Sequence, residues 1–83
     1  MSSNELLIAK GRLSELNERY KEYEMKADSL LIQIRELLNP FSDFLELDLE
    51  KVLMLVKEFR QLQLKARECS DKIYKIKETY NIG

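Results

Sequence analysis

The side chains that could do chemistry in this chain of 83 residues are a single cysteine, four tyrosines and many charged groups, and histidine is absent. Without histidine the chain cannot form histidine-based triads, the common zinc sites or the Glu-x-x-His pairs of helical di-metal bundles. Cys69 has no histidine to activate it and no second cysteine for an intramolecular disulfide. A glycine-rich phosphate loop is also missing. We therefore expect a protein that is not an enzyme and needs no cofactor or metal.

A second chemical feature is a set of cations that recur at seven-residue spacing, which places them on one face of a helix. They are Arg12, Arg19 and Lys26 in the first half and Lys51, Lys65 and Lys72 in the second. Such a flank could bind an anion, either an acidic helix or a nucleic-acid backbone. The simpler interpretation is a solvated flank that neighbouring carboxylates partly neutralise. The net charge of -1 and the lack of interleaved exposed aromatic residues weigh against nucleic acid.

Two long helical segments with one break must position these groups. Pro40 cannot lie inside a helix, and it restricts Asn39 to extended conformations. The sequence therefore predicts a helix over about 3–38, a turn over about 39–48 and a second helix over about 49–80, all within one domain that spans 1–83.

The ends of both helices carry capping signals. Ser2 and Glu5 have the spacing of a capping box at the first helix. For the second helix we expect Asp48 as the N-cap rather than Ser42, which could cap a short turn instead. Asn81 and Gly83 are suited to end this helix.

Apolar or small residues recur at alternating steps of three and four through both segments, which is the heptad pattern of a coiled coil. In the first segment these seam positions are Leu6, Ala9, Leu13, Leu16, Tyr20, Tyr23, Ala27, Leu30, Ile34 and Leu37. In the second they are Val52, Leu55, Phe59, Leu62, Ala66, Cys69, Ile73, Ile76 and Tyr80. The predicted fold class is all-α, a long antiparallel coiled-coil-like hairpin.

Side-chain size predicts how the two segments align. If facing residues have numbers that add to 89, Tyr23 faces Ala66 and Tyr20 faces Cys69, so that large residues meet small ones. We interpret Cys69 and the seam tyrosines as packing residues rather than as a reactive thiol or a ligand-stacking ladder.

Apolar residues beyond the seam predict self-association. Leu31, Leu38, Leu49 and Val56 directly flank the seam near the turn, and Leu53 lies further round the second segment. A lone hairpin cannot cover this surface, so we expect two hairpins to form a dimeric four-helix bundle through it. Phe41 and Phe44 in the turn could anchor a partner, but we expect them to fold back over Leu37, Leu38 and Leu49.

These features favour a protein–protein interaction module, such as an assembly factor, adaptor, small chaperone or inhibitor, that acts as a homo-oligomeric bundle. The alternative is a small nucleic-acid-binding four-helix bundle that uses the basic flank. The chain has no signal-peptide pattern and no apolar run of the ~18 residues that span a bilayer. A membrane-surface helix is disfavoured because acidic residues crowd the outer faces. We therefore expect a cytoplasmic protein without membrane contact.

Overall fold

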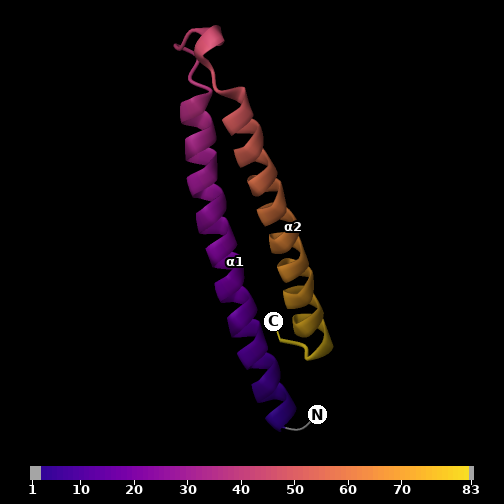
Figure 1. Ribbon diagram of the computed structural model, residues 1–83. Coiled ribbons are helices and arrows are strands. Elements are labelled where there is room, and N and C mark those ends of the chain that lie inside the picture. Colours follow the sequence, from indigo (N-terminus) through magenta and orange to yellow (C-terminus); the bar gives the residue numbers. More distant parts are fainter. Residues whose placement is uncertain (1–2, 83) are drawn as a thin grey trace.

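The computed structural model describes residues 3–82 and contains two long helices joined by a loop. The order of elements is α1 (Ser3–Leu37), the short 3-10 helix η1 (Phe44–Glu46) and α2 (Leu49–Thr79). The helices run side by side in opposite directions, with both termini at one end and the loop at the other (Figure 1). The predicted all-α antiparallel hairpin is confirmed, and the helix ends lie within one residue of the predicted ones.

Local hydrogen bonds explain why α1 ends before the proline. Leu38 N–H still donates to Ile34 O at 3.0 Å, which is the last bond of helical type. Asn39 Oδ1 then accepts from Phe41 N–H at 3.0 Å, and Asn39 O accepts from Ser42 N–H at 3.1 Å. Asparagine and proline thus build a tight turn directly after the end of α1.

The start of α2 is the predicted one. The Asp48 carboxylate accepts a hydrogen bond from Lys51 N–H at 3.1 Å, as an N-cap residue does. Half-buried Leu47 and buried Val52 stand at the two positions of a hydrophobic staple around this cap. The short turn before it is capped by Asp43, which accepts from Leu45 N–H at 3.1 Å, and not by Ser42.

The end of α2 is a Schellman motif. Asn81 has a φ of 53°, in the left-handed region that asparagine tolerates better than most residues. Ile82 N–H donates to Lys77 O at 2.9 Å, and Asn81 N–H donates to Glu78 O at 3.4 Å. The expected roles of Ser2 and Gly83 in capping lie outside the described residues.

The burial pattern follows the predicted seam. The most buried side chains are Ala9, Leu13, Val52, Leu55 and Cys69, and every other seam residue is half-buried. Each remaining residue of α1 and α2 is exposed. The heptad pattern therefore identified which face of each helix meets the other.

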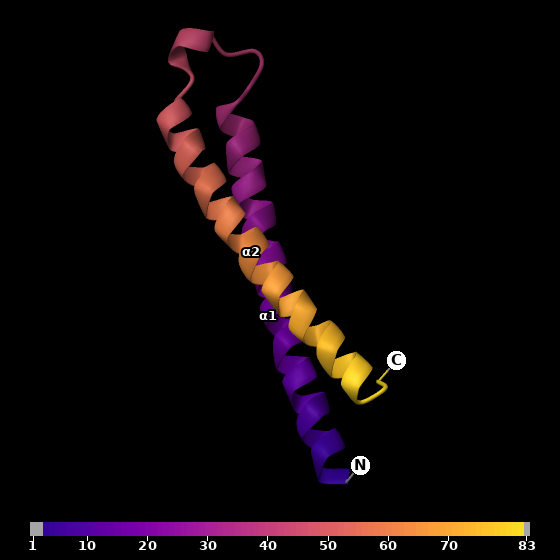
Figure 2. The same cartoon turned by 90° about the vertical axis from the view of Figure 1, so that its right-hand side faces the viewer.

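The hairpin is a rod rather than a globule. It measures 63 × 16 × 14 Å, and its radius of gyration is 18.6 Å, against about 12 Å for a compact domain of this length. The first turns of α1 extend beyond the end of α2 (Figures 1 and 2). Among residues 3–82 no large side chain is completely buried, so the two helices share a seam and not a closed core.

Candidate protein-interaction surfaces

An apolar patch lies on one flank of the hairpin close to the turn. We call it the tip patch. It consists of Leu31 from α1, Leu38 directly after the end of α1, and Leu49, Leu53 and Val56 from α2. All five side chains are 43–59% exposed, so packing between α1 and α2 covers only about half of each.

Heptad geometry explains how these residues form one surface. Leu31, Leu38 and Val56 each follow a seam residue directly, which places them at the edge of the contact between α1 and α2. Leu53 lies between Leu49 and Val56 on the same face of α2, at helical spacings of four and three. The tip patch is therefore continuous along α2.

The tip patch is confined to the half of the rod nearest the turn. Further along the same flank the equivalent positions are Glu24 and Asn17 on α1 and Gln63 and Ser70 on α2, all exposed. These polar side chains are satisfied by water and give no reason for association. The flank is thus apolar near the turn and polar toward the termini.

The loop adds exposed aromatic surface next to the tip patch. Phe41 is 95% exposed and Phe44 is 77% exposed. The expectation that both rings fold back over the helix ends was wrong. Hydrogen bonds within the loop, to the side chains of Asn39 and Asp43, satisfy its backbone locally and carry the chain outward beyond the helices (Figure 2).

The exposed area shows how incompletely the hairpin covers itself. Its solvent-accessible surface is 7012 Å², whereas a compact monomer of 9.9 kDa exposes about 5200 Å². The difference, roughly 1800 Å² for one chain, exceeds the ~800 Å² that each partner buries in a standard interface.

The opposite flank holds the cations predicted from the sequence. Three adjoining hollows follow each other along it between α1 and α2, and we call them together the basic groove. Their charged lining residues are Arg12, Glu15, Arg19, Lys26, Glu58, Lys65, Glu68, Lys72 and Lys75. The structure thus brings five of the six predicted cations together. Lys51, in the first turn of α2, is not part of this lining.

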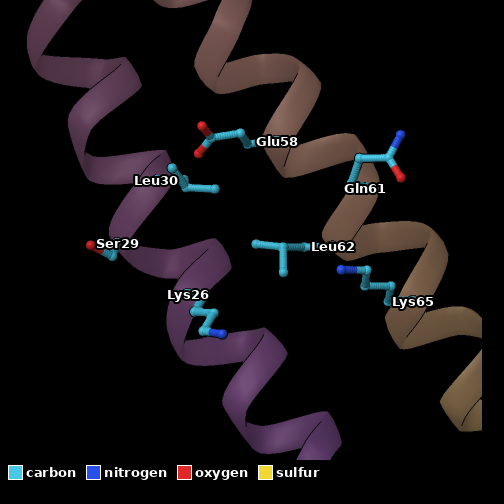
Figure 3. Close-up of a pocket in the computed structure, with 7 residues that line it drawn as sticks. All are labelled: Lys26, Ser29, Leu30, Glu58, Gln61, Leu62 and Lys65. Atoms are coloured by element: carbon cyan, nitrogen blue, oxygen red, sulfur yellow. The ribbon is translucent and has the colours of Figure 1, made fainter.

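The hollow nearest the turn has a volume of about 420 Å³ and shows the construction of the groove (Figure 3). Leu30 from α1 and Leu62 from α2 project into the space between the helices. The ammonium groups of Lys26 and Lys65 extend toward this space from opposite helices, whereas Ser29 and Gln61 lie toward its outer sides. The floor is apolar and the rim is largely basic.

Over residues 3–82 one ion pair engages a cation of the groove. Lys72 Nζ lies 3.6 Å from Glu68 Oε1, but both side chains are more than half exposed, so this pair contributes little to stability. In the described part of the chain Arg12, Arg19, Lys26, Lys65 and Lys75 have no ion-pair partner.

Two features of the groove were missed from the sequence. Lys75 lines it although it lies outside the seven-residue series, and its spacing of three residues from Lys72 was the available signal. Leu30 and Leu62 were assigned to the seam alone, yet they are half-buried and also form the floor.

Cys69 and three of the four tyrosines lie on the seam, whereas Tyr74 is exposed. Cys69 is 5% exposed, and Tyr20, Tyr23 and Tyr80 are half-buried. Over residues 3–82 no three metal-ligating side chains come together in a way that could hold an ion.

Neither helix, as far as residues 3–82 define it, is long and apolar enough to cross a bilayer. Comparison of the chain with protein-family models, with curated proteins and with solved structures gave no match.

Proposed function

We propose that this chain is a non-enzymatic protein–protein interaction module that acts as a homodimeric helical bundle. Such a module would serve as an assembly factor, adaptor, small chaperone or inhibitor. The observation that carries the proposal is the tip patch, five aliphatic side chains that remain about half exposed on one flank. Exposed apolar patches on a small protein mark the places where it meets a partner.

Association would supply the buried apolar surface that a lone hairpin lacks. One core in a chain of this size supplies only about 3–5 kcal/mol, and this chain has a seam in place of a core. Burial of apolar surface contributes about 25 cal/mol per Å². A second hairpin on the tip patch would enclose the half of the seam nearest the turn within a four-helix bundle.

The position of the tip patch near one end of the rod favours one way of pairing two hairpins. A full-length antiparallel dimer would set the tip patch of one copy against the polar flank around Glu24 and Gln63 of the other. Apolar surface meets apolar surface only when the two tip patches overlap. A two-fold arrangement with the patches facing each other satisfies this and is self-complementary.

Light-scattering mass measured over a range of concentrations tests the proposal. The wild-type chain is expected to have twice the mass of one chain. The double variant Leu31→Asp/Val56→Asp is expected to have the mass of one chain and to remain helical by circular dichroism, because both positions lie outside the seam.

The matched control is Ile32→Asp/Met54→Asp, which makes the same change at exposed apolar positions near the tip patch but outside it. This control is expected to remain dimeric. A wild-type chain that is monomeric and cooperatively folded at all concentrations contradicts the proposal, as does a control that dissociates as readily as the patch variant.

A further inference from the structure

We infer that the basic groove binds an acidic amphipathic α-helix of another protein, which lies along α1 and α2 as a third helix. The groove is on the opposite flank from the tip patch. This inference therefore does not depend on dimerisation, and the two surfaces can fail or succeed separately.

The floor of the groove suits the apolar ridge of a helix. Its members are seam residues, namely the half-buried Leu16, Tyr23, Leu30, Leu62 and Ile76 and the buried Cys69. Side chains from a third helix can pack into the hollow between two others, as in any helical bundle. The hollow of about 420 Å³ at Leu30 and Leu62 has room for large aliphatic side chains.

The net positive charge of the groove predicts a partner with negative charge. Six cations and three carboxylates line it, a net charge of +3. The formal charge of the chain is -1, so the remaining residues carry -4. A partner with carboxylates on both sides of its apolar ridge would meet the cations of both walls, and the rest of the surface would repel it.

The length of the groove sets the length of the partner. On α1 its lining runs from Arg12 to Leu30, and on α2 from Glu58 to Ile76. A helix rises about 1.5 Å per residue, so this span is about 27 Å and matches a partner of roughly 18 residues.

The same lining favours a helix over a nucleic acid. A phosphate backbone gains from unopposed cations, but Glu15, Glu58 and Glu68 lie among the cations here. An apolar floor contributes nothing to phosphate binding, and Tyr23 is the single aromatic residue of the lining on which a base could stack.

Fluorescence anisotropy with a labelled synthetic helix tests the inference. The probe is a peptide of about three heptads with leucine at both seam positions, glutamate at the flanking positions and alanine elsewhere. The control peptide carries lysine in place of every glutamate. The acidic peptide is expected to bind, more weakly as salt is raised, and the basic peptide is not.

Charge reversal in the protein locates the binding site. Lys26→Glu/Lys65→Glu is expected to weaken binding of the acidic peptide by at least about tenfold, since it reverses two groove charges. The matched control is Lys10→Glu/Lys77→Glu, the same two reversals on the flank that carries the tip patch, and it is expected to bind as the wild type does. If circular dichroism shows that the groove variant has unfolded, Lys26→Gln/Lys65→Gln replaces it.

Several results would overturn the inference. They are equal binding of the two peptides, equal weakening in the two charge-reversal variants, and displacement of the acidic peptide by a single-stranded or duplex oligonucleotide. Competition by a second copy of this chain, lost in the groove variant, would make the occupant a second copy instead. Leu31→Asp/Val56→Asp is expected to bind the peptide normally, which separates failure of the groove from failure of the tip patch.

Discussion

The thiol of Cys69 on α2 donates a hydrogen bond to the carbonyl oxygen of Leu16 on α1, with 3.1 Å between sulfur and oxygen. In α1 that carbonyl points along the helix toward Tyr20, the residue that the alignment by side-chain size sets opposite Cys69. The small residue at 69 lets the two helices approach closely where α1 carries a large one.

Cys69 should therefore report on the opening of the hairpin. Because Cys69 is 5% exposed and its thiol donates to the Leu16 carbonyl, we expect a thiol reagent to modify it only when the helices separate. The labelling rate should rise with denaturant in parallel with the loss of helical signal. Rapid modification of the fully folded chain would contradict the packing described here.

Replacing Cys69 with a larger residue should lower the free energy of unfolding. Cys69→Leu places a longer side chain against the backbone of α1 at Leu16 and is expected to destabilise the fold by about 1–3 kcal/mol. Cys69→Ala removes only a weak donor and is expected to cost about 1 kcal/mol or less. Chemical denaturation of the two variants measures the difference, and equal stabilities would show that no close approach exists at this point.

A charge on the seam should unfold the hairpin. Leu62→Asp puts an unpaired carboxylate between the helices, and its cost of several kcal/mol exceeds what a chain of this size has to lose. Leu64→Asp is the control, because Leu64 is exposed on the same helix, and it is expected to change stability by less than about 0.5 kcal/mol. Circular dichroism at 25 °C should show loss of helix in the first variant alone.

Gly11→Ala should stabilise the protein. Gly11 lies in the interior of α1, and a methyl group added there would meet no atom within 4 Å. Alanine in an exposed helical position is favoured over glycine by about 1 kcal/mol. The melting temperature should rise by roughly 4–8 °C for a chain of this length, and a fall would mean that this face is covered in solution.

Loss of the α2 cap should destabilise the fold. Asp48→Ala removes the carboxylate that accepts from Lys51 N–H and is expected to cost about 1 kcal/mol. Asp43→Ala removes the same kind of hydrogen bond, but from the exposed three-residue η1, and is expected to have a smaller effect. The free energies of unfolding of the two variants, measured in urea, should differ in this order.

Much of the fold could be predicted because its causes are local in the sequence. Pro40 and Asn39 stop one helix, Asp48 starts the next, and Asn81 takes the left-handed conformation that ends it. Each of these effects depends on residues within one turn of the chain. The heptad spacing identified the seam because a residue's place around a helix follows from its number alone.

The exposure of the two phenylalanines in the loop could not be predicted from such local effects. Their apolar character predicted burial, but burial requires a surface within reach, and the end of a two-helix rod offers very little. Hydrogen bonds that the side chains of Asn39 and Asp43 accept from Phe41 N–H and Leu45 N–H shape the loop instead.

The sequence by itself determined the two helices, their ends, the faces that meet, five of the six cations that line the basic groove and the aliphatic residues of the tip patch. The tertiary structure alone decided that Lys26 and Lys65 share one hollow with Leu30 and Leu62 as its floor, and that Phe41 and Phe44 stay exposed. The physical reason is that periodicity defines a direction around one helix, whereas a groove depends on the distance between side chains of two helices far apart in the chain.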